Sequence, residues 1–166
     1  MSKRILLVDD ERSIRDSLNK ILGAEHYQVL LAGDGLEAIE KHGAERIDLL
    51  ILDLNIPVQD GRDALEWLVE TNPLVPIVII TGRPNQRALA ESAGASALME
   101  KPLDIPLLLR TICQLLNEPT ESRTLRARNR APGLRYVPRE NELFCDMLLK
   151  RFDTEKPAAA TPPTDQ

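Results

Sequence analysis

Short aliphatic runs alternate with segments of helical spacing over about the first 118 residues of the chain. The runs occupy residues 5–8, 29–31, 47–52, 77–80 and 97–99. Each is too short for a stable helix, and most are rich in Leu, Ile and Val, as strands buried on both faces of a sheet are. We therefore predict a strand at each of these runs.

The segments between the runs place apolar residues three or four positions apart, which predicts amphipathic helices. The predicted helical stripes are Ile14, Leu18, Ile21 and Leu22; Leu36 and Ile39; Leu65, Leu68 and Val69; residues 85–93; and Leu108, Leu109, Ile112, Leu115 and Leu116. Asp60 and Asp104 are predicted N-caps of the third and fifth helices, and Gly23 and Gly94 are predicted helix ends.

The order of these elements is strand then helix, repeated five times. Buried parallel strands that are joined by crossover helices form a doubly wound α/β sheet. In such sheets the reactive crevice lies outside the carboxyl ends of the strands. The residues that follow each predicted strand are therefore the candidates for chemistry.

Polar side chains follow four of the five predicted strands. Asp9 and Asp10 come directly after the first, Asp53 after the third, Thr81 after the fourth, and Lys101 after the fifth. The parallel order brings these strand ends to the same edge of the sheet. We therefore expect a rim with at least three carboxylates, one hydroxyl and one ammonium.

Such a rim suits phosphoryl transfer onto a carboxylate. Three carboxylates at one edge repel each other, and a hard divalent cation such as Mg²⁺ relieves the repulsion. A lysine and a threonine opposite the metal would supply a charge and a hydrogen-bond donor for a phosphoryl group. In that reaction a carboxylate is the nucleophile, and the metal and the lysine neutralise the charge in transfer.

Taken singly, most of these residues have a simpler explanation. Asp9 or Asp10 could be the N-cap of the next helix, and Lys101 could be a solvated surface lysine. Asp53 fits this explanation less well, because it precedes the loop Leu54-Asn55-Ile56-Pro57 and not an immediate helix. The functional interpretation depends on the joint pattern.

These residues match a known family: the chain resembles the receiver domain of two-component response regulators, of the CheY-like superfamily. The resemblance covers about residues 3–118 and implies a flavodoxin-like (βα)5 fold with strand order 2-1-3-4-5. The matching motifs are Val8-Asp9-Asp10-Glu11, Leu52-Asp53-Leu54-Asn55-Ile56-Pro57 with Asp60-Gly61 after it, Ile79-Ile80-Thr81-Gly82, Gly94-Ala95-Ser96-Ala97 and Glu100-Lys101-Pro102.

The resemblance implies a role for each residue of the rim. Asp53 would accept the phosphoryl group from a phosphohistidine of a sensor kinase. Asp10 would bind Mg²⁺ directly with Asp53, Asp9 would help through water, and the backbone carbonyl of Asn55 would complete the protein ligands. Thr81 would donate a hydrogen bond to the phosphoryl oxygens, and Lys101 would pair with them.

Three finer expectations also come from the resemblance. The Lys101-Pro102 peptide bond is expected to be cis, and Asn55 and Arg83 hold the two variable positions expected to tune self-catalysed dephosphorylation. The family often has Tyr or Phe as a rotating switch three residues before the lysine, where this chain has Leu98. It therefore stays open whether the usual readout, on the face formed by the fourth helix, the fifth strand and the fifth helix, operates here, and Leu98 could simply be a core residue.

The composition changes near residue 118. Residues 1–118 hold 12 Lys and Arg against 19 Asp and Glu, whereas residues 119–166 hold 9 against 7. Six arginines and no acid lie between Arg123 and Arg139, and six of the twelve prolines follow residue 118. We therefore predict a receiver domain over residues 1–118 and a separate extension.

The extension is predicted in three parts. Residues 119–138 are interpreted as a linker, and residues 154–166 as a disordered tail. Residues 139–153 are predicted as an amphipathic helix whose apolar face holds Leu143, Phe144, Met147, Leu148 and Phe152. This helix could cover a patch on its own receiver, or it could be a partner-binding or dimerisation element.

Taken together, these features predict a signalling switch that is phosphorylated and acts through contacts with other proteins. Its net charge of −5, and an extension too short for a winged helix, argue against DNA binding. The longest apolar run is too short to cross a membrane, the N-terminus is unlike a signal peptide, and two cysteines 32 positions apart suit a cytoplasmic location.

Several alternatives stay open from sequence alone. The chief one is an adaptor that does not depend on phosphorylation and binds through the C-terminal helix. A transcription factor with a reduced output segment and a small metal-dependent phosphatase fit the sequence less well. The expected partners are a sensor histidine kinase or phosphotransfer protein and an unknown protein target, with a homodimer left open.

Overall fold

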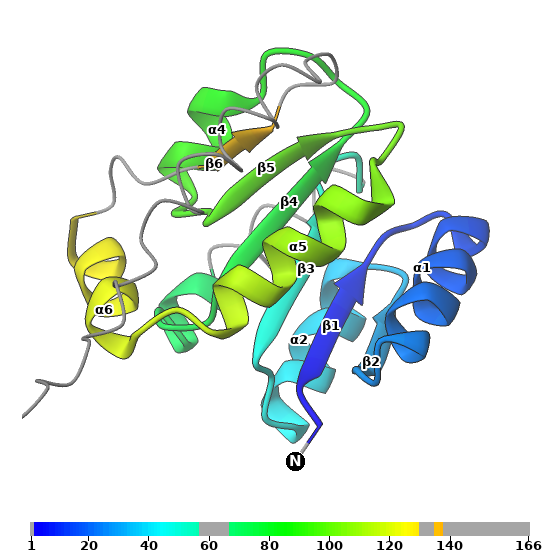
Figure 1. The fold of residues 1–166 in the computed structure, drawn as a ribbon, viewed down its shortest axis with the longest axis horizontal. Coiled ribbons are helices and arrows are strands. Elements are labelled where there is room, and N and C mark those ends of the chain that lie inside the picture. Colours follow the sequence, from blue (N-terminus) through cyan, green and yellow to red (C-terminus); the bar gives the residue numbers. More distant parts are fainter. Residues whose placement is uncertain (1, 57–66, 130–134, 138–166) are drawn as a thin grey trace, which may run out of the picture.

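Parallel strands form a single sheet in the computed structural model, which describes residues 2–56, 67–129 and 135–137 (Figure 1). The order is β2-β1-β3-β4-β5-β6. The strands are β1 (Arg4–Val8), β2 (Gln28–Ala32), β3 (Leu49–Asp53), β4 (Ile77–Thr81), β5 (Ala97–Glu100) and β6 (Arg135–Val137). The first five have the predicted order 2-1-3-4-5, which confirms the doubly wound, flavodoxin-like fold.

Helices follow the first five strands at the predicted places, and a further helix lies in the segment predicted as a linker. They are α1 (Arg12–Ala24), α2 (Gly35–Ala44), α4 (Arg87–Ser92), α5 (Ile105–Leu116) and α6 (Thr120–Asn129). Residues 67–71 are also helical, whereas Asp60 and the rest of the predicted third helix lie outside the described residues. Within the described ranges, no helix is both long enough and apolar enough to cross a membrane.

Each face of the sheet packs against its own helices. On β1, Ile5 and Leu7 belong to one core cluster, with apolar residues of α1 and α5, while Leu6 and Val8 belong to the other, with α2 and α4. This alternation is the period of two that a strand imposes. It confirms that the aliphatic runs are strands buried on both faces.

Local signals set most of the helix ends. The Asp104 carboxylate accepts a hydrogen bond from the backbone N–H of Leu107 at 2.9 Å, so it caps α5 as predicted. Gly94 follows α4 with φ +71°, a conformation that glycine adopts without strain. The predicted stop at Gly23 is wrong, because α1 continues to Ala24 and the positive φ, 63°, falls at His26.

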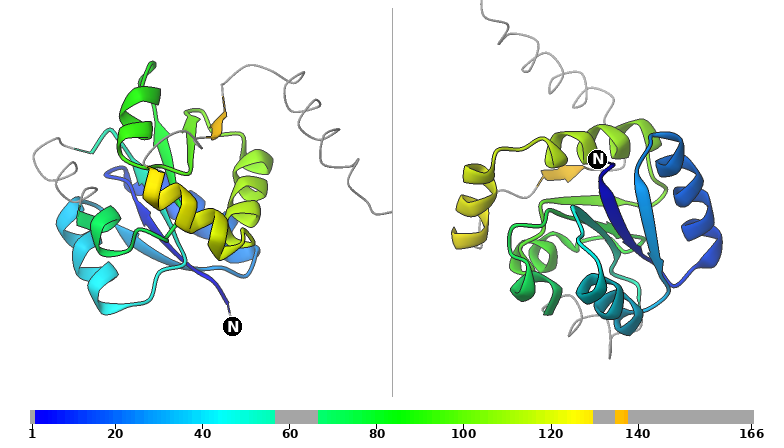
Figure 2. Two further views of the ribbon diagram at one scale, coloured as in Figure 1. Left: turned by 90° about the vertical axis from the view of Figure 1, so that its left-hand side faces the viewer. Right: turned by 90° about the horizontal axis from the view of Figure 1, so that it is seen from below.

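The described part of residues 119–138, the segment that the sequence predicts as a linker, holds α6 and β6. Arg123 of α6 donates from Nη2 to the carbonyl oxygens of Leu115 and Leu116, at 2.8 and 2.9 Å, and so satisfies two of the carbonyls at the C-terminal end of α5 that have no partner within the helix. β6 pairs with β5 in parallel, with Tyr136 opposite Leu98 (Figure 2). The predicted helix at 139–153 and the tail at 154–166 lie outside the described residues.

Candidate functional site

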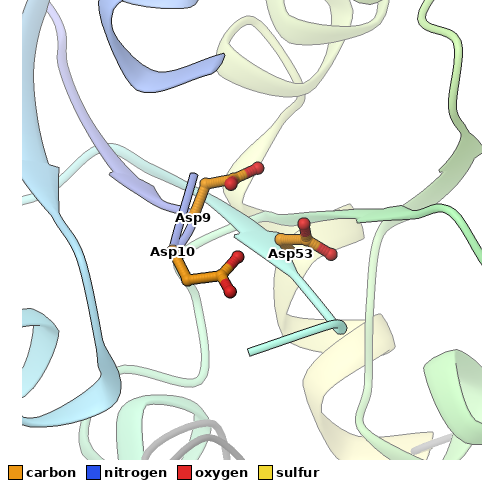
Figure 3. A group of neighbouring side chains, drawn as sticks. All are labelled: Asp9, Asp10 and Asp53. Atoms are coloured by element: carbon orange, nitrogen blue, oxygen red, sulfur yellow. The ribbon is translucent and has the colours of Figure 1, made fainter. Parts of the chain in front are cut away.

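Three aspartates meet at the carboxyl ends of β1 and β3. Asp9 and Asp10 follow β1, and Asp53 is the last residue of β3. One carboxylate oxygen of each lies within 4.8 Å of those of the other two, and Figure 3 shows the side chains of Asp9 and Asp10 extending toward Asp53. The structure therefore brings together the acidic rim that the sequence predicts.

Asp9 and Asp53 are buried, but Asp10 is exposed. The Asp9 carboxylate accepts a hydrogen bond through Oδ1 from the backbone N–H of Glu11 at 2.8 Å. The Asp53 carboxylate accepts one through Oδ1 from the backbone N–H of Asn55, also at 2.8 Å. Each buried carboxylate is thus fixed by the turn that follows it, which leaves its Oδ2 directed to another group.

Lys101 bridges the two buried carboxylates. Its Nζ lies 2.6 Å from Asp53 Oδ2 and 3.0 Å from Asp9 Oδ2, and its side chain is 20% exposed. The peptide bond between Lys101 and Pro102 is cis, as the resemblance implied. Lys101 follows β5 and its backbone N–H donates to the Thr81 carbonyl at 2.8 Å, so the β4–β5 pairing carries it to the site.

The charges in this cluster shift the pKa values of two groups. Burial raises the pKa of Asp9, and the neighbouring Asp53 charge adds to the rise, although the Glu11 amide and Lys101 act against it. Burial alone would lower the pKa of Lys101, but the hydrogen bonds and charges of Asp53 and Asp9 outweigh it and raise that pKa. Lys101 therefore stays a cation at neutral pH.

Thr81 is completely buried at the end of β4. Its hydroxyl oxygen accepts a hydrogen bond from the backbone N–H of Arg83 at 3.0 Å. The side chain of Arg83 is exposed, and Arg83 contacts Thr81 through its backbone. The structure thus places Thr81 on the same rim, held by the turn that follows it, and it gives no contact between the Arg83 guanidinium and the acidic cluster.

The donors fit a hard divalent cation such as Mg²⁺. All three aspartates offer carboxylate oxygens, and the exposure of Asp10 leaves room for water ligands, which Mg²⁺ usually keeps. The side-chain oxygen Oδ1 of Asn55 is buried, and it has no hydrogen-bond partner among the described residues. An unsatisfied buried acceptor on Asn55, whose backbone N–H holds Asp53, is a further reason to expect a cation or its water at this rim.

Two further residues bear on the site: Leu98, which the sequence singles out, and Arg15, which it does not. Leu98, in the usual position of the aromatic switch, is fully buried in the core cluster that packs against α4. Arg15 was not predicted as a site residue, yet its Nη1 donates to the backbone carbonyl of Asp9 at 2.5 Å. Its only sequence signal is its position one helical turn after Glu11, the N-cap of α1.

The fold and the site together define a receiver domain. The family model described as the response regulator receiver domain matches residues 5–113 of the chain. The chain therefore belongs to the family of response regulator receiver domains. This membership is consistent with two-component signalling.

Curated relatives support the same family. "Response regulator MprA" of Mycobacterium ulcerans is 39% identical over 118 residues, covering 70% of this chain and 51% of that protein. The protein of the same name from Mycobacterium leprae is 39% identical over 115 residues, covering 68% and 50%. The chain spans about half the length of these relatives.

Solved structures of receiver domains share the fold. A CheY-like receiver domain protein from Methanospirillum hungatei has a TM-score of 0.67 and 32% identity, covering 74% of this chain and 98% of that one. The response regulator TrrA from Thermotoga maritima, solved in complex with Mg(2+)-BeF, has a TM-score of 0.62 and 31% identity, covering 68% and 98%.

Proposed function

We propose that this chain is the phosphoacceptor receiver of a two-component phosphorelay, with Asp53 as the residue that is phosphorylated. The single observation that supports this most strongly is the position of Asp53. It is a buried carboxylate at the end of the central strand β3, in contact with Lys101 and clustered with Asp9 and Asp10. The donor is a phosphohistidine of a sensor histidine kinase or of a phosphotransfer protein.

The transfer forms one bond and breaks another. A carboxylate oxygen of Asp53 attacks phosphorus, the bond between phosphorus and the donor imidazole nitrogen breaks, and that nitrogen keeps the electron pair. Asn55 holds Asp53 through its backbone N–H, so the carboxylate is already oriented. Lys101 is close enough to pair with the negative oxygens of the phosphoryl group as they arrive.

Asp9, Asp10, Asp53 and the backbone carbonyl of Asn55 would hold Mg²⁺. When bound, the ion neutralises charge on the transferring phosphoryl group. Without it, Lys101 is the one cation in contact with the buried carboxylates among the described residues. The response regulator TrrA was solved in complex with Mg(2+)-BeF, which supports the same use of the acidic rim here.

The signal would then pass from Asp53 to the surface through Thr81 and Lys101. A phosphoryl group on Asp53 would offer the Thr81 hydroxyl a stronger acceptor than the backbone carbonyl of Arg83, to which it now donates at 3.4 Å. The two states of this rim would differ in their affinity for a protein target in the cytoplasm. Asn55 and Arg83 would influence how fast water removes the phosphoryl group.

The test is phosphorylation of the whole chain by acetyl phosphate with MgCl₂, measured by intact mass and by Phos-tag mobility. We expect a gain of one phosphoryl group in the wild type and in Asp16→Asn, which changes an exposed carboxylate on α1. We expect none in Asp53→Asn, which keeps the shape of the side chain but removes its nucleophilic charge. Chelation by EDTA should abolish the gain.

Either of two results would sink the proposal. One is a wild-type chain that gains no phosphoryl group from acetyl phosphate or from any cognate kinase. The other is a modification that persists in Asp53→Asn. The alternative, an adaptor acting through residues 139–153, concerns a segment outside the described residues, and no observation of the structure favours it.

A further inference from the structure

The peptide between Asp9 and Asp10 is tied to helix α1 by Arg15. The Arg15 guanidinium donates from Nη1 to the backbone carbonyl oxygen of Asp9 at 2.5 Å. That oxygen belongs to the peptide group that links Asp9 to Asp10. The hydrogen bond therefore fixes the plane of this peptide, and with it the direction in which the backbone presents Asp10.

The position of the Asp10 carboxylate depends on the backbone more than the positions of the Asp9 and Asp53 carboxylates do. Asp9 is fixed by its own side-chain bonds to Glu11 and Lys101, and its N–H donates to the Ala32 carbonyl at 3.2 Å. Asp10 is exposed, and its carboxylate makes no hydrogen bond or ion pair within the described part of the chain. Whatever holds its backbone therefore sets the direction from which its carboxylate reaches the cluster.

Arg15 is itself held from its other side. A Cβ placed on Gly33, in the β2–α2 loop, would lie 3.5 Å from Arg15 Nη1, so the guanidinium rests close to the Gly33 backbone. The backbone N–H of Gly33 donates to the Glu37 carboxylate at 2.7 Å. The Arg15 charge also helps to lower the pKa of Glu37, after the larger effects of Lys41 and Gly33. Arg15 thus links α1, the end of β1 and the β2–α2 loop.

We propose that Arg15 is a positioning residue for the Mg²⁺ site, acting through the Asp9–Asp10 peptide. This inference rests on the proposed function, because it takes the aspartate cluster to be the site of the metal. Arg15 does not contact a metal-binding carboxylate itself. It keeps Asp10 where its carboxylate can share a cation with Asp53.

A charge effect and a positioning effect predict opposite changes in the affinity for Mg²⁺ when Arg15 is replaced. Removal of a cation close to an acidic cluster strengthens the attraction of the cluster for Mg²⁺. Loss of a group that orients a ligand weakens metal binding, typically by tenfold or more. A titration of one variant can therefore separate a positioning role from a mere charge effect.

The experiment is an NMR titration of the full-length chain with MgCl₂, which gives a dissociation constant without any phosphorylation. We expect Arg15→Gln to raise the dissociation constant about tenfold, and Arg15→Lys, which keeps a donor and a charge, to fall between it and the wild type. The control is Arg12→Gln. It removes the same charge from the first turn of α1, where the Arg12 side chain is 86% exposed and pairs with Asp16.

A second measurement separates positioning from a general loss of structure. With acetyl phosphate, Arg15→Gln should need about tenfold more Mg²⁺ for half-maximal phosphorylation, but its rate at saturating Mg²⁺ should stay within about twofold of the wild type. If Arg15→Gln does not fold, Arg15→Lys is the test. It should also need more Mg²⁺ than the wild type for half-maximal phosphorylation, with an unchanged maximal rate.

Equal or tighter Mg²⁺ binding in the Arg15 variants would overturn the inference, and so would an equal loss in Arg12→Gln. A wild-type chain that binds no Mg²⁺ would instead overturn the proposed function. The two failures are therefore distinguishable.

Discussion

Asp9 and Asp53 are held by the same pair of contacts. Each accepts a hydrogen bond through Oδ1 from the backbone N–H two residues further on, and each accepts Lys101 Nζ through Oδ2. One ammonium group therefore balances two buried carboxylates when no metal is bound. Asp10 does not share in this arrangement, so removing Lys101 and removing Asp10 should have opposite effects on stability.

The first prediction concerns Lys101. Replacing it by Met leaves two buried carboxylates without a counter-charge, and the loss of one partner of a buried ion pair is strongly destabilising. We expect Lys101→Met to lower the free energy of unfolding by about 2 kcal/mol in EDTA, less than for a fully buried pair because Lys101 is partly exposed. Urea unfolding can be followed by the fluorescence of Trp67, the single tryptophan.

Added MgCl₂ should restore much of that loss, because the cation takes over the neutralising role of the lysine. Lys3→Met is the matched control. Its partner Asp48 lies at the other end of β3, the Lys3 side chain is 48% exposed, and an exposed pair contributes little. An equal loss of stability in both variants would contradict the special role of Lys101.

The second prediction concerns Asp10. Its carboxylate lies within 4.8 Å of two others, so Asp10→Asn removes like-charge repulsion and should raise the free energy of unfolding in EDTA by about 1 kcal/mol. The same variant should lose most of the stabilisation that MgCl₂ gives to the wild type. Urea unfolding with and without the metal measures both effects, and a variant that is less stable than the wild type in EDTA would contradict the prediction.

The third prediction is a pH dependence centred on His42. Its ring is buried against Trp67 with the two rings edge to face, and its Nδ1 has no hydrogen-bond partner among the described residues. Burial lowers the pKa of His42, so the unfolded chain binds a proton more readily than the folded protein. Stability should therefore fall as the pH drops below the unfolded value, about 6.5, and the loss should be complete below the folded pKa.

We expect His42→Gln to lose less stability than the wild type when the pH falls from about 7.5 to about 5.5, a range that brackets the unfolded pKa. The other histidine provides the control. His26 is exposed and has a positive φ, so His26→Asn keeps a residue that tolerates this backbone. Its pH dependence should follow the wild type. If His42→Gln loses stability as steeply as the wild type when the pH falls, groups other than His42 cause the pH dependence.

The fourth prediction concerns β6, which extends the sheet beyond β5. Consecutive backbone N–H groups of a strand point to opposite edges, so only one of residues 136 and 137 donates toward β5. Tyr136→Pro and Val137→Pro are therefore a matched pair, in which one variant removes a ladder hydrogen bond and the other keeps it.

We expect one of the two proline variants to speed amide hydrogen exchange in β5, over Ala97–Glu100, and the other to leave it close to the wild type. The expected difference is about 1 kcal/mol in the opening free energy, the contribution of one hydrogen bond. Equal exchange in β5 in both variants and in the wild type would show that β6 does not protect that edge in solution.

The elements of the receiver could be predicted because periodicity is a local property. Ile5 and Leu7 face one core and Leu6 and Val8 the other, so a run of aliphatic residues marks a strand buried on both faces before any partner is known. Parallel order then places Asp53 and Lys101 on one rim, because the carboxyl ends of all the strands reach the same edge.

The C-terminal extension could not be predicted in the same way. Residues 120–137 are rich in arginine and show no apolar period, which favours a linker. In the structure α6 is joined to α5 by Arg123, and β6 is paired to β5 through its backbone. Almost every residue can form backbone hydrogen bonds, whatever its side chain. The pairing of β6 with β5 therefore leaves no pattern in the sequence.

The spacing of apolar and polar residues is enough to predict the kinds of elements, their order and the rim on which the reactive groups lie. Which groups touch depends on the folded domain. Lys101 contacts two carboxylates 92 and 48 positions away, and Arg15 binds a backbone carbonyl instead of a side chain. Such contacts depend on distances of a few ångströms between separate elements, which the packing of the whole domain sets.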